Sequence, residues 1–191
     1  MARALPPPYD DEGPHALWHY SEDPGIEVFR PRRVQVSESD DELVWAIDTR
    51  HAPSFWFPRD CPRGTAWPGP RTTPEDLERF FGHTDSGRLH VIELGWVERV
   101  QQCELYAYRL PEETFEPHGV GGYWVSEATV EAREVVPVGD LLARHADAGI
   151  ELRLTPNLWT WWLDVAGSSL EFSGSRLRNC ALPMPQVPAA R

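Results

Sequence analysis

Leu17-Trp18-His19-Tyr20-Ser21 is the stretch that decides the fold, because an apolar and aromatic run opens the patterned part of the chain there. Asp23-Pro24-Gly25 follows within two residues and is typical of a turn, so the run predicts a strand of about five residues. Leu43-Val44-Trp45-Ala46-Ile47 is a second run of the same kind, rich in β-branched and aromatic residues. We expect both runs to be strands.

Helical signals alternate irregularly with further strand-like runs. Asp48 precedes an expected helix over 49–57, and Thr73-Pro74-Glu75-Asp76 combines a capping residue, a proline and first-turn acids. Apolar residues spaced for one face follow Thr155-Pro156 and predict a final helix. We therefore expect an α+β fold with mixed, mostly antiparallel strands and short helices, not a doubly wound sheet. Residues 16–182 are expected to form a single domain, with 1–15 and 183–191 as disordered tails.

Charge and composition exclude several classes of protein. The 191 residues contain 30 acidic and 18 basic side chains, so the net charge is −12, and all the basic residues are arginine. Wrapping duplex nucleic acid needs many phosphates neutralised, so we do not expect a duplex partner. The absence of lysine excludes Schiff-base chemistry and the lysine-containing phosphate loop. No run is apolar and long enough to span a membrane, and three widely separated cysteines favour a reducing, cytoplasmic setting.

The familiar catalytic and metal-binding patterns are absent from the sequence. It contains no G-x-G-x-x-G, no H-E-x-x-H, no G-x-S-x-G and no paired Cys/His spacing for zinc. We therefore predict neither a metal site nor a resident cofactor.

Two strings resemble the opening motifs of the ADP-ribosyltransferase fold, which includes the RNA 2′-phosphotransferases. They are Leu17–Ser21, with its histidine before a turn, and Val44–Asp48, followed by a segment bearing Ala52 and Phe55. The resemblance covers about residues 16–138. It implies an ADP-ribosyltransferase-like sheet arrangement in which His19 hydrogen-bonds a ribose of NAD.

The same resemblance implies a catalytic glutamate on a late strand. Glu127 fits best, at the end of Tyr123-Trp124-Val125-Ser126-Glu127, with Glu131 and Glu134 as alternatives. The chain departs from the usual pattern at the middle aromatic residue, for which Trp45 and Phe55 are stand-ins.

Longer strings are similar to an uncharacterised bacterial family, a domain of unknown function. They include His19-Tyr20-Ser21-Glu22-Asp23-Pro24, Phe57-Pro58-Arg59-Asp60-Cys61-Pro62-Arg63 and Thr155-Pro156-Asn157-Leu158-Trp159. This resemblance spans nearly all of the patterned chain and implies no activity.

Arginines cluster beside the two flagged strands. Arg32 follows the first strand, and Arg59 and Arg63 flank Cys61 in a loop stiffened by two prolines. Arginine suits bidentate binding of phosphate. We expect an anion-binding pocket, and its predicted lining is His19, Arg32, Arg59 and Arg63, with Trp45 and His51 as further ligand-binding residues. The alternative is that these arginines pair with the chain's many carboxylates.

The predicted function is the binding of a nucleotide-like or other phosphate-bearing ligand of the NAD or ADP-ribose type. Transferase chemistry would use His19 and Glu127 as catalytic residues, with NAD as a substrate rather than a cofactor. A non-catalytic small-ligand or protein-interaction module is the alternative, so enzymatic activity stays open. A further possibility is a thiol enzyme using Cys61, with Arg59 and Arg63 lowering its pKa and His51 as the base.

Overall fold

The first predicted strand is present as β1 (Leu17–Ser21), and it lies inside a sheet of seven strands. The structure is a computed structural model that describes residues 16–33, 41–119 and 121–183. The tails expected over 1–15 and 183–191 lie outside this range, apart from residue 183. Contacts between Cα atoms divide the chain into two compact units, each built from separate stretches of sequence. Of the described residues, unit 1 holds Asp60–Gln102 and those from Leu142 onward, and unit 2 holds those up to Arg59 together with Cys103–Leu141.

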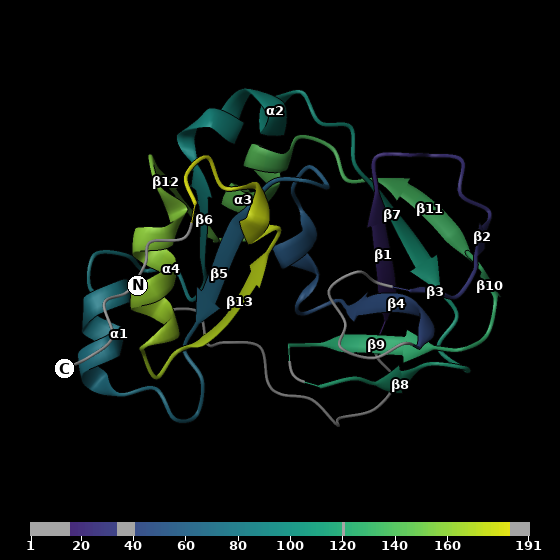
Figure 1. Cartoon of the computed structure of the whole chain (residues 1–191), viewed down its shortest axis with the longest axis horizontal. Helices are drawn as coiled ribbons and strands as arrows, with labels where there is room; N and C mark the ends of the chain where they lie inside the picture. Colours follow the sequence, from purple (N-terminus) through teal and green to yellow (C-terminus); the bar gives the residue numbers. More distant parts are fainter. Residues whose placement is uncertain (1–15, 34–40, 120, 184–191) are drawn as a thin grey trace. The chain divides into compact units, whose positions relative to one another are not determined.

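Unit 2 consists mainly of strands (Figure 1). After β1 its elements are β2 (Val28–Phe29), β3 (Arg32–Arg33), β4 (Glu42–Asp48), the 3-10 turn η1 (Ala52–Phe55), β7 (Tyr106–Leu110), β8 (Glu116–Pro117), β9 (Tyr123–Ser126), β10 (Val130–Glu131) and β11 (Glu134–Pro137). The large sheet has the order β11-β7-β1-β4-β9-β8, with β3 also paired to β4, and β10 pairs with β2. All of these pairs are antiparallel.

Strand alternation gives unit 2 its core. One face buries apolar residues of β1, β4 and β7, which pack with a loop residue and residues of β2 and β10: Leu17, Phe29, Val44, Ala46, Tyr108, Leu110, Phe115 and Val130. The buried Tyr108 hydroxyl donates to the Asp23 carbonyl and accepts from the Ile26 amide at 3.1 Å. This phenol therefore holds the turn that follows β1 against the core.

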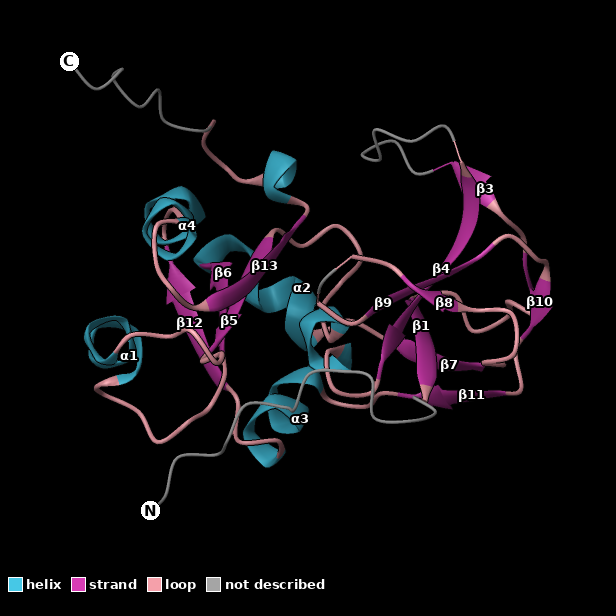
Figure 2. Ribbon diagram, turned by 90° about the horizontal axis from the view of Figure 1, so that it is seen from below, coloured by secondary structure: helices cyan, strands magenta, loops and turns pink. Residues whose placement is uncertain are grey.

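Unit 1 is a four-stranded sheet with helices. Its elements are β5 (Arg63–Trp67), α1 (Pro74–Phe81), β6 (Leu89–Glu93), η2 (Leu94–Trp96), α2 (Val97–Gln101), α3 (Leu141–Asp147, whose first residue belongs to unit 2), β12 (Glu151–Thr155), α4 (Leu158–Ala166), β13 (Glu171–Ser175) and η3 (Leu177–Asn179). The strand order is β12-β6-β5-β13, with β12 parallel to β6 and the other pairs antiparallel. Figure 2 shows α1 and α4 along one side of this sheet.

Two glycines let α4 approach the sheet of unit 1 closely. Gly64 and Gly174 face each other across β5 and β13. A Cβ on Gly64 would overlap ring carbons of Trp161, and a Cβ on Gly174 would overlap the Trp162 ring. Only residues without a side chain leave room here for two indoles.

These elements confirm the expected mixed α+β fold and its mostly antiparallel strands. The single domain over 16–182 and the ADP-ribosyltransferase-like arrangement stay predictions. The helix expected over 49–57 is wrong in extent, because the segment is helical only as the short turn η1. Pro53 lies at the start of this turn, and three of its four residues are buried.

Candidate functional site

His19 lies in the middle of β1, and its ring contacts β4. Nδ1 is 3.0 Å from the carbonyl oxygen of Trp45. Along β4, Trp45 lies between the residues that pair with β1 and those that pair with β3. The His19 ring also packs against Phe29, with a centroid distance of 4.8 Å. His19 therefore provides a side-chain bond to a β4 carbonyl in the gap between two strand pairings.

The environment of His19 keeps its imidazole neutral. Burial lowers its pKa to about 4, the Trp45 carbonyl opposes this shift, and the positive charges of Arg32 and Arg59 lower the pKa further. A carbonyl accepts hydrogen bonds only, so the proton of the neutral ring lies on Nδ1. Nε2 then carries a lone pair and is a hydrogen-bond acceptor.

Two of the predicted arginines act on His19. Arg32 in β3 and Arg59 after η1 are both exposed, and both belong to unit 2. The Arg59 backbone amide donates to Glu22 Oε1 at 2.8 Å, which fixes the loop that carries this side chain. Arg63 lies in unit 1, where it is buried in β5 and donates from Nη1 to the Cys61 carbonyl at 3.0 Å. Of the three predicted arginines, Arg32 and Arg59 are thus the two that lie exposed in unit 2.

A row of aromatic rings runs along the face of the unit 2 sheet that carries Trp45. Trp45 contacts His118 and Tyr123 edge-on, at 4.9 and 6.0 Å between centroids. Phe55 contacts Tyr123 at 6.1 Å and stacks with Tyr20 at 6.4 Å. We call Tyr20, Trp45, Phe55, His118 and Tyr123 the ring face; none of the five is buried.

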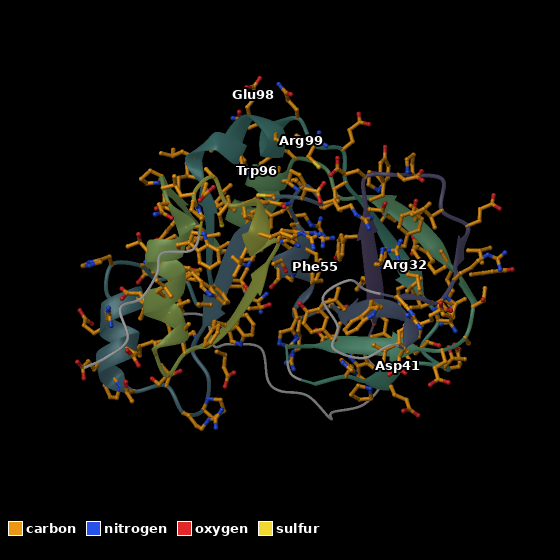
Figure 3. All side chains as sticks on the ribbon, viewed as in Figure 1. Arg32, Asp41, Phe55, Trp96, Glu98 and Arg99 are labelled. Carbon is orange, nitrogen blue, oxygen red and sulfur yellow. The ribbon has the colours of Figure 1, made fainter. Side chains whose placement is uncertain are left out.

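Arg32 belongs to the same side of the sheet as Trp45. Arg32 pairs with Leu43, and side chains two residues apart on a strand point to one side. Figure 3 labels Arg32 and Phe55 among the side chains of unit 2. Sequence analysis considered Trp45 and Phe55 but missed Tyr20, His118 and Tyr123 as members of one surface.

Glu127 is exposed and is the first residue after β9. The pairing of β4 with β9 ends one residue earlier, at Val44 and Ser126, and Glu127 lies in a bend. The alternatives Glu131 and Glu134 are exposed on β10 and β11. Of the three, Glu127 is the one that directly follows the strand paired with β4.

His51 makes a buried pair with Asp48. Its Nδ1 is 2.8 and 3.0 Å from the two Asp48 carboxylate oxygens, and its backbone amide donates to Oδ1 at 2.8 Å. His51 is 3% exposed and Asp48 is 4% exposed. The ring predicted to bind ligand is therefore committed to a contact inside the fold.

Unit 1 contains a second buried imidazole contact. Nδ1 of His90 in β6 lies 2.9 Å from Nε2 of His145 in α3. Burial is the main cause that lowers the pKa of His90 well below its usual value, and the charges of His145, Arg88 and Arg63 add to it. Cys61 is fully buried, with its thiol 3.7 Å from the Pro62 carbonyl.

Residues for a resident metal or a membrane span are not found in the part of the chain that the structure describes. No group of three or more His, Cys, Asp or Glu side chains there is placed to hold a metal ion. No helix among the same residues has the length and apolar character that crossing a membrane requires.

Comparison with known proteins identifies a family whose function is unknown. Residues 18–180 match the model of a family of unknown function, DUF6886, so the chain belongs to this family. No curated protein and no solved structure matches the chain. The resemblance to an uncharacterised family is thereby confirmed.

Proposed function

We propose that this member of a family of unknown function binds a nucleotide-like, phosphate-bearing ligand on the ring face of unit 2. The observation that carries the proposal is that Arg32 and Arg59 lie close enough for both charges to act on His19, and that Arg32 lies on the side of the sheet that carries the row of aromatic rings. A nucleotide combines an anion, hydroxyl groups and a planar base, which are the three groups that these side chains recognise.

Each part of the face has a matching part of the ligand. Exposed guanidinium groups bind phosphate oxygens through paired N–H donors. Neutral His19 points to the side of β1 opposite to Tyr20; it donates from Nδ1 to Trp45 and offers Nε2 to a ligand hydroxyl from that side. Partly exposed rings such as Tyr20 and Tyr123 provide edges and faces for a planar base. The ligand class proposed is that of ADP-ribose and NAD.

The proposal also includes a reaction, the transfer of ADP-ribose from NAD to an acceptor. With NAD as substrate, the bond between nicotinamide and the ribose carbon breaks and its electron pair leaves with nicotinamide. The acceptor's nucleophilic atom forms the new bond to that carbon, and Glu127 takes the proton that the acceptor loses. Support for this step is the position of Glu127 directly after β9, the strand that pairs with β4, together with the resemblance of the first two strands to the ADP-ribosyltransferase fold.

Calorimetric titration with ADP-ribose, NAD, adenosine and inorganic pyrophosphate tests the proposal. Arg32→Ala is expected to weaken ADP-ribose binding about tenfold or more, since a charge-assisted hydrogen bond contributes about 1.5–3 kcal/mol. Arg30→Ala is the matched control, because Arg30 is an exposed arginine two residues away. The absence of heat with every ligand at millimolar concentration would eliminate nucleotide binding.

His19→Asn separates recognition from structure. The asparagine amide N–H₂ can replace Nδ1 as the donor to the Trp45 carbonyl, but it provides no counterpart of Nε2. We expect unchanged thermal stability and weaker binding of ADP-ribose, with pyrophosphate binding unaffected. Equal loss for both ligands would assign His19 a role in the fold alone.

A non-catalytic interaction module is the second candidate, and the ring face also favours it. Aromatic side chains are enriched at protein interfaces, and five of them lie together here. Nucleotide binding without release of nicotinamide from NAD would favour a ligand-binding module over a transferase.

We also propose that the protein works in the cytoplasm. Cys61, Cys103 and Cys180 each carry a thiol rather than half of a disulfide, which suits a reducing compartment. Fractionation of cells that produce the full chain tests the location.

A further inference from the structure

The Asp48–His51 pair lies where two segments of unit 2 leave the sheet. Asp48 is the last residue of β4, and its carboxylate binds both the His51 ring and the His51 backbone amide. One carboxylate therefore fixes the backbone turn between 48 and 51 and the orientation of the imidazole together. Both side chains are buried, where hydrogen bonds are stronger than in water.

The first segment held by the pair is η1. His51 is the residue before this turn, and its carbonyl accepts from the Ser54 amide at 3.0 Å. The His51 side chain makes no capping bond to η1. The start of η1 is therefore fixed by Asp48 through the His51 amide, and Phe55 is the last residue of the turn.

The second segment is the glycine turn before β9. The Asp48 amide donates to the Gly122 carbonyl at 3.0 Å. Gly122 has φ +76°, and a Cβ there would overlap His51 Nδ1 and Asp48 Oδ2. The backbone at 122 thus packs directly on the pair, and Tyr123 is the next residue.

The two segments meet again at the ring face. Phe55 comes from η1 and Tyr123 from β9, and their rings touch edge-on at 6.1 Å with an interplanar angle of 87°. The Tyr123 carbonyl accepts from the His118 amide at 2.8 Å, so the same turn also sets the backbone at His118. Three of the five members of the ring face therefore follow from the geometry around one buried pair.

We infer that Asp48 and His51 are positioning residues of the ring face, which hold Phe55 and Tyr123 in contact through η1 and the Gly122 turn. The link to ligand affinity rests on the proposed function. The position of the rings does not, and it can be measured without ligand. This assigns His51 a role through its neighbours instead of the direct ligand contact that sequence analysis predicted.

The test compares His51→Ala with His51→Asn by NMR on protein carrying ¹³C-labelled tyrosine. Asparagine can place its amide donor near the position of Nδ1 and keep the bond to Asp48, whereas alanine removes it. We expect the Tyr123 ring signal, assigned with Tyr123→Phe, to shift in His51→Ala and to return in His51→Asn. His145→Asn, a change at a buried histidine of unit 1, is the control and leaves the Tyr123 signal in place.

The ligand readout uses ADP-ribose and the same variants. His51→Ala is expected to weaken binding about tenfold, and His51→Asn restores it, because affinity depends on preorganised contacts. A shifted Tyr123 signal without any ADP-ribose binding, even by the wild type, would refute the proposed function while supporting the positioning role. An unshifted Tyr123 signal in folded His51→Ala overturns the positioning role.

Asp48→Asn keeps the inference testable if His51→Ala does not fold. This variant preserves side-chain volume and one acceptor oxygen but removes the charge that faces the His51 ring. A Tyr123 shift in the same direction as in His51→Ala, or any shift where His51→Ala cannot be measured, supports the role. An unchanged Tyr123 signal contradicts it.

Discussion

The sheets of the two units use their aromatic residues in opposite ways. In unit 1 the rings of Trp161 and Trp162 come from a helix and lie on glycines of the sheet. In unit 2 the rings of Trp45 and Tyr123 come from the strands themselves and touch each other edge-on. All four rings are half-buried, so the two sets differ in what they pack on and not in exposure. The rings that lie on glycines have a structural role, and those beside Arg32 are the ones to which we propose that a ligand binds.

The histidines of the two units also differ in the partners that they bind. In unit 1, His90 and His145 bind each other, so a ring nitrogen of each is used within the pair. In unit 2, His19 binds a backbone carbonyl through Nδ1, which leaves Nε2 an acceptor next to the charges of Arg32 and Arg59. The partner of an imidazole, more than its burial, decides whether it can serve a ligand.

Gly64→Ala disturbs the packing of indole on glycine in unit 1, and its expected effect on stability is the largest. The new Cβ would overlap the Trp161 ring, and overpacking of this kind costs about 3 kcal/mol. Urea unfolding measures the loss, and hydrogen exchange should locate it in unit 1. Gly95→Ala is the control, because a Cβ at Gly95 meets no atom within 4 Å. Equal stability of the two variants would contradict the role assigned to the indoles.

Unfolding at acid pH tests whether His19 and His90, one in each unit, are neutral. Burial lowers the pKa of His19 to about 4 and that of His90 well below its usual value. Between pH 6.5 and the lowered pKa, the unfolded chain binds a proton that the folded chain does not, so stability falls as the pH falls. For His19 the slope reaches about 1.4 kcal/mol per pH unit, or about 2 kcal/mol between pH 6.5 and pH 5, and His90 adds a slope of the same sign.

Single variants assign this slope to a unit. His90→Asn and His19→Asn each retain a donor near the position of Nδ1 and remove a titrating group. Urea unfolding between pH 8 and pH 5 should show a shallower slope for each variant than for the wild type. Stability that is constant across this range in the wild type would refute the buried, neutral state of both rings.

Much of the fold could be predicted because local signals agreed with the structure. Thr73-Pro74 correctly predicted the start of α1, and the Thr73 side chain accepts a hydrogen bond from the Asp76 amide. Strand β13 was missed, because Ser173-Gly174 is typical of a turn, and nothing nearby in sequence announces that Gly174 receives the Trp162 ring. A glycine required by a helix on another segment cannot be distinguished from a turn glycine by its neighbours.

The candidate site was predictable only in part, for a related reason. His19, Arg32 and Arg59 come from segments whose clustering is visible in the sequence, and in the structure the charges of both arginines act on the neutral His19. The ring face combines residues from positions 20 to 123 of the chain. They become neighbours only through the pairing register of the strands, which the sequence does not reveal. The pairing of His51 had a visible signal, since Asp48 stands three residues before it at the end of a predicted strand. Arg63, which sequence analysis placed in the loop around Cys61, is instead the first residue of the buried strand β5.

Tyr108→Phe probes the core of unit 2 with a smaller expected effect. The variant keeps the ring and removes the hydroxyl that donates to Asp23 and accepts from the Ile26 amide. Polar groups left without that partner cost about 1.5 kcal/mol. Urea unfolding measures this loss, and hydrogen exchange should rise in the turn after β1. Tyr106→Phe, at a half-buried position of the same strand, serves as the control.

The Tyr108→Phe variant also tests whether the two units unfold independently. If units 1 and 2 open independently, faster exchange stays within unit 2 and the peptides of β5 and β6 keep their protection. Faster exchange throughout both units would instead indicate a single cooperative structure and remove the basis for comparing them.

Thr73→Ala has the smallest expected effect and tests a feature confined to unit 1. The Thr73 side chain accepts from the Asp76 amide at 3.2 Å at the start of α1, and losing such a cap costs about 1 kcal/mol. Thr73→Ser is the control, since serine keeps the hydroxyl. Because α1 packs its buried Phe80 and Phe81 in the core on the helix side of the unit 1 sheet, the loss should appear in unfolding of unit 1 and leave ADP-ribose binding by unit 2 unchanged. Weaker binding in Thr73→Ala at unchanged stability would mean that the ligand site does not lie within unit 2 alone.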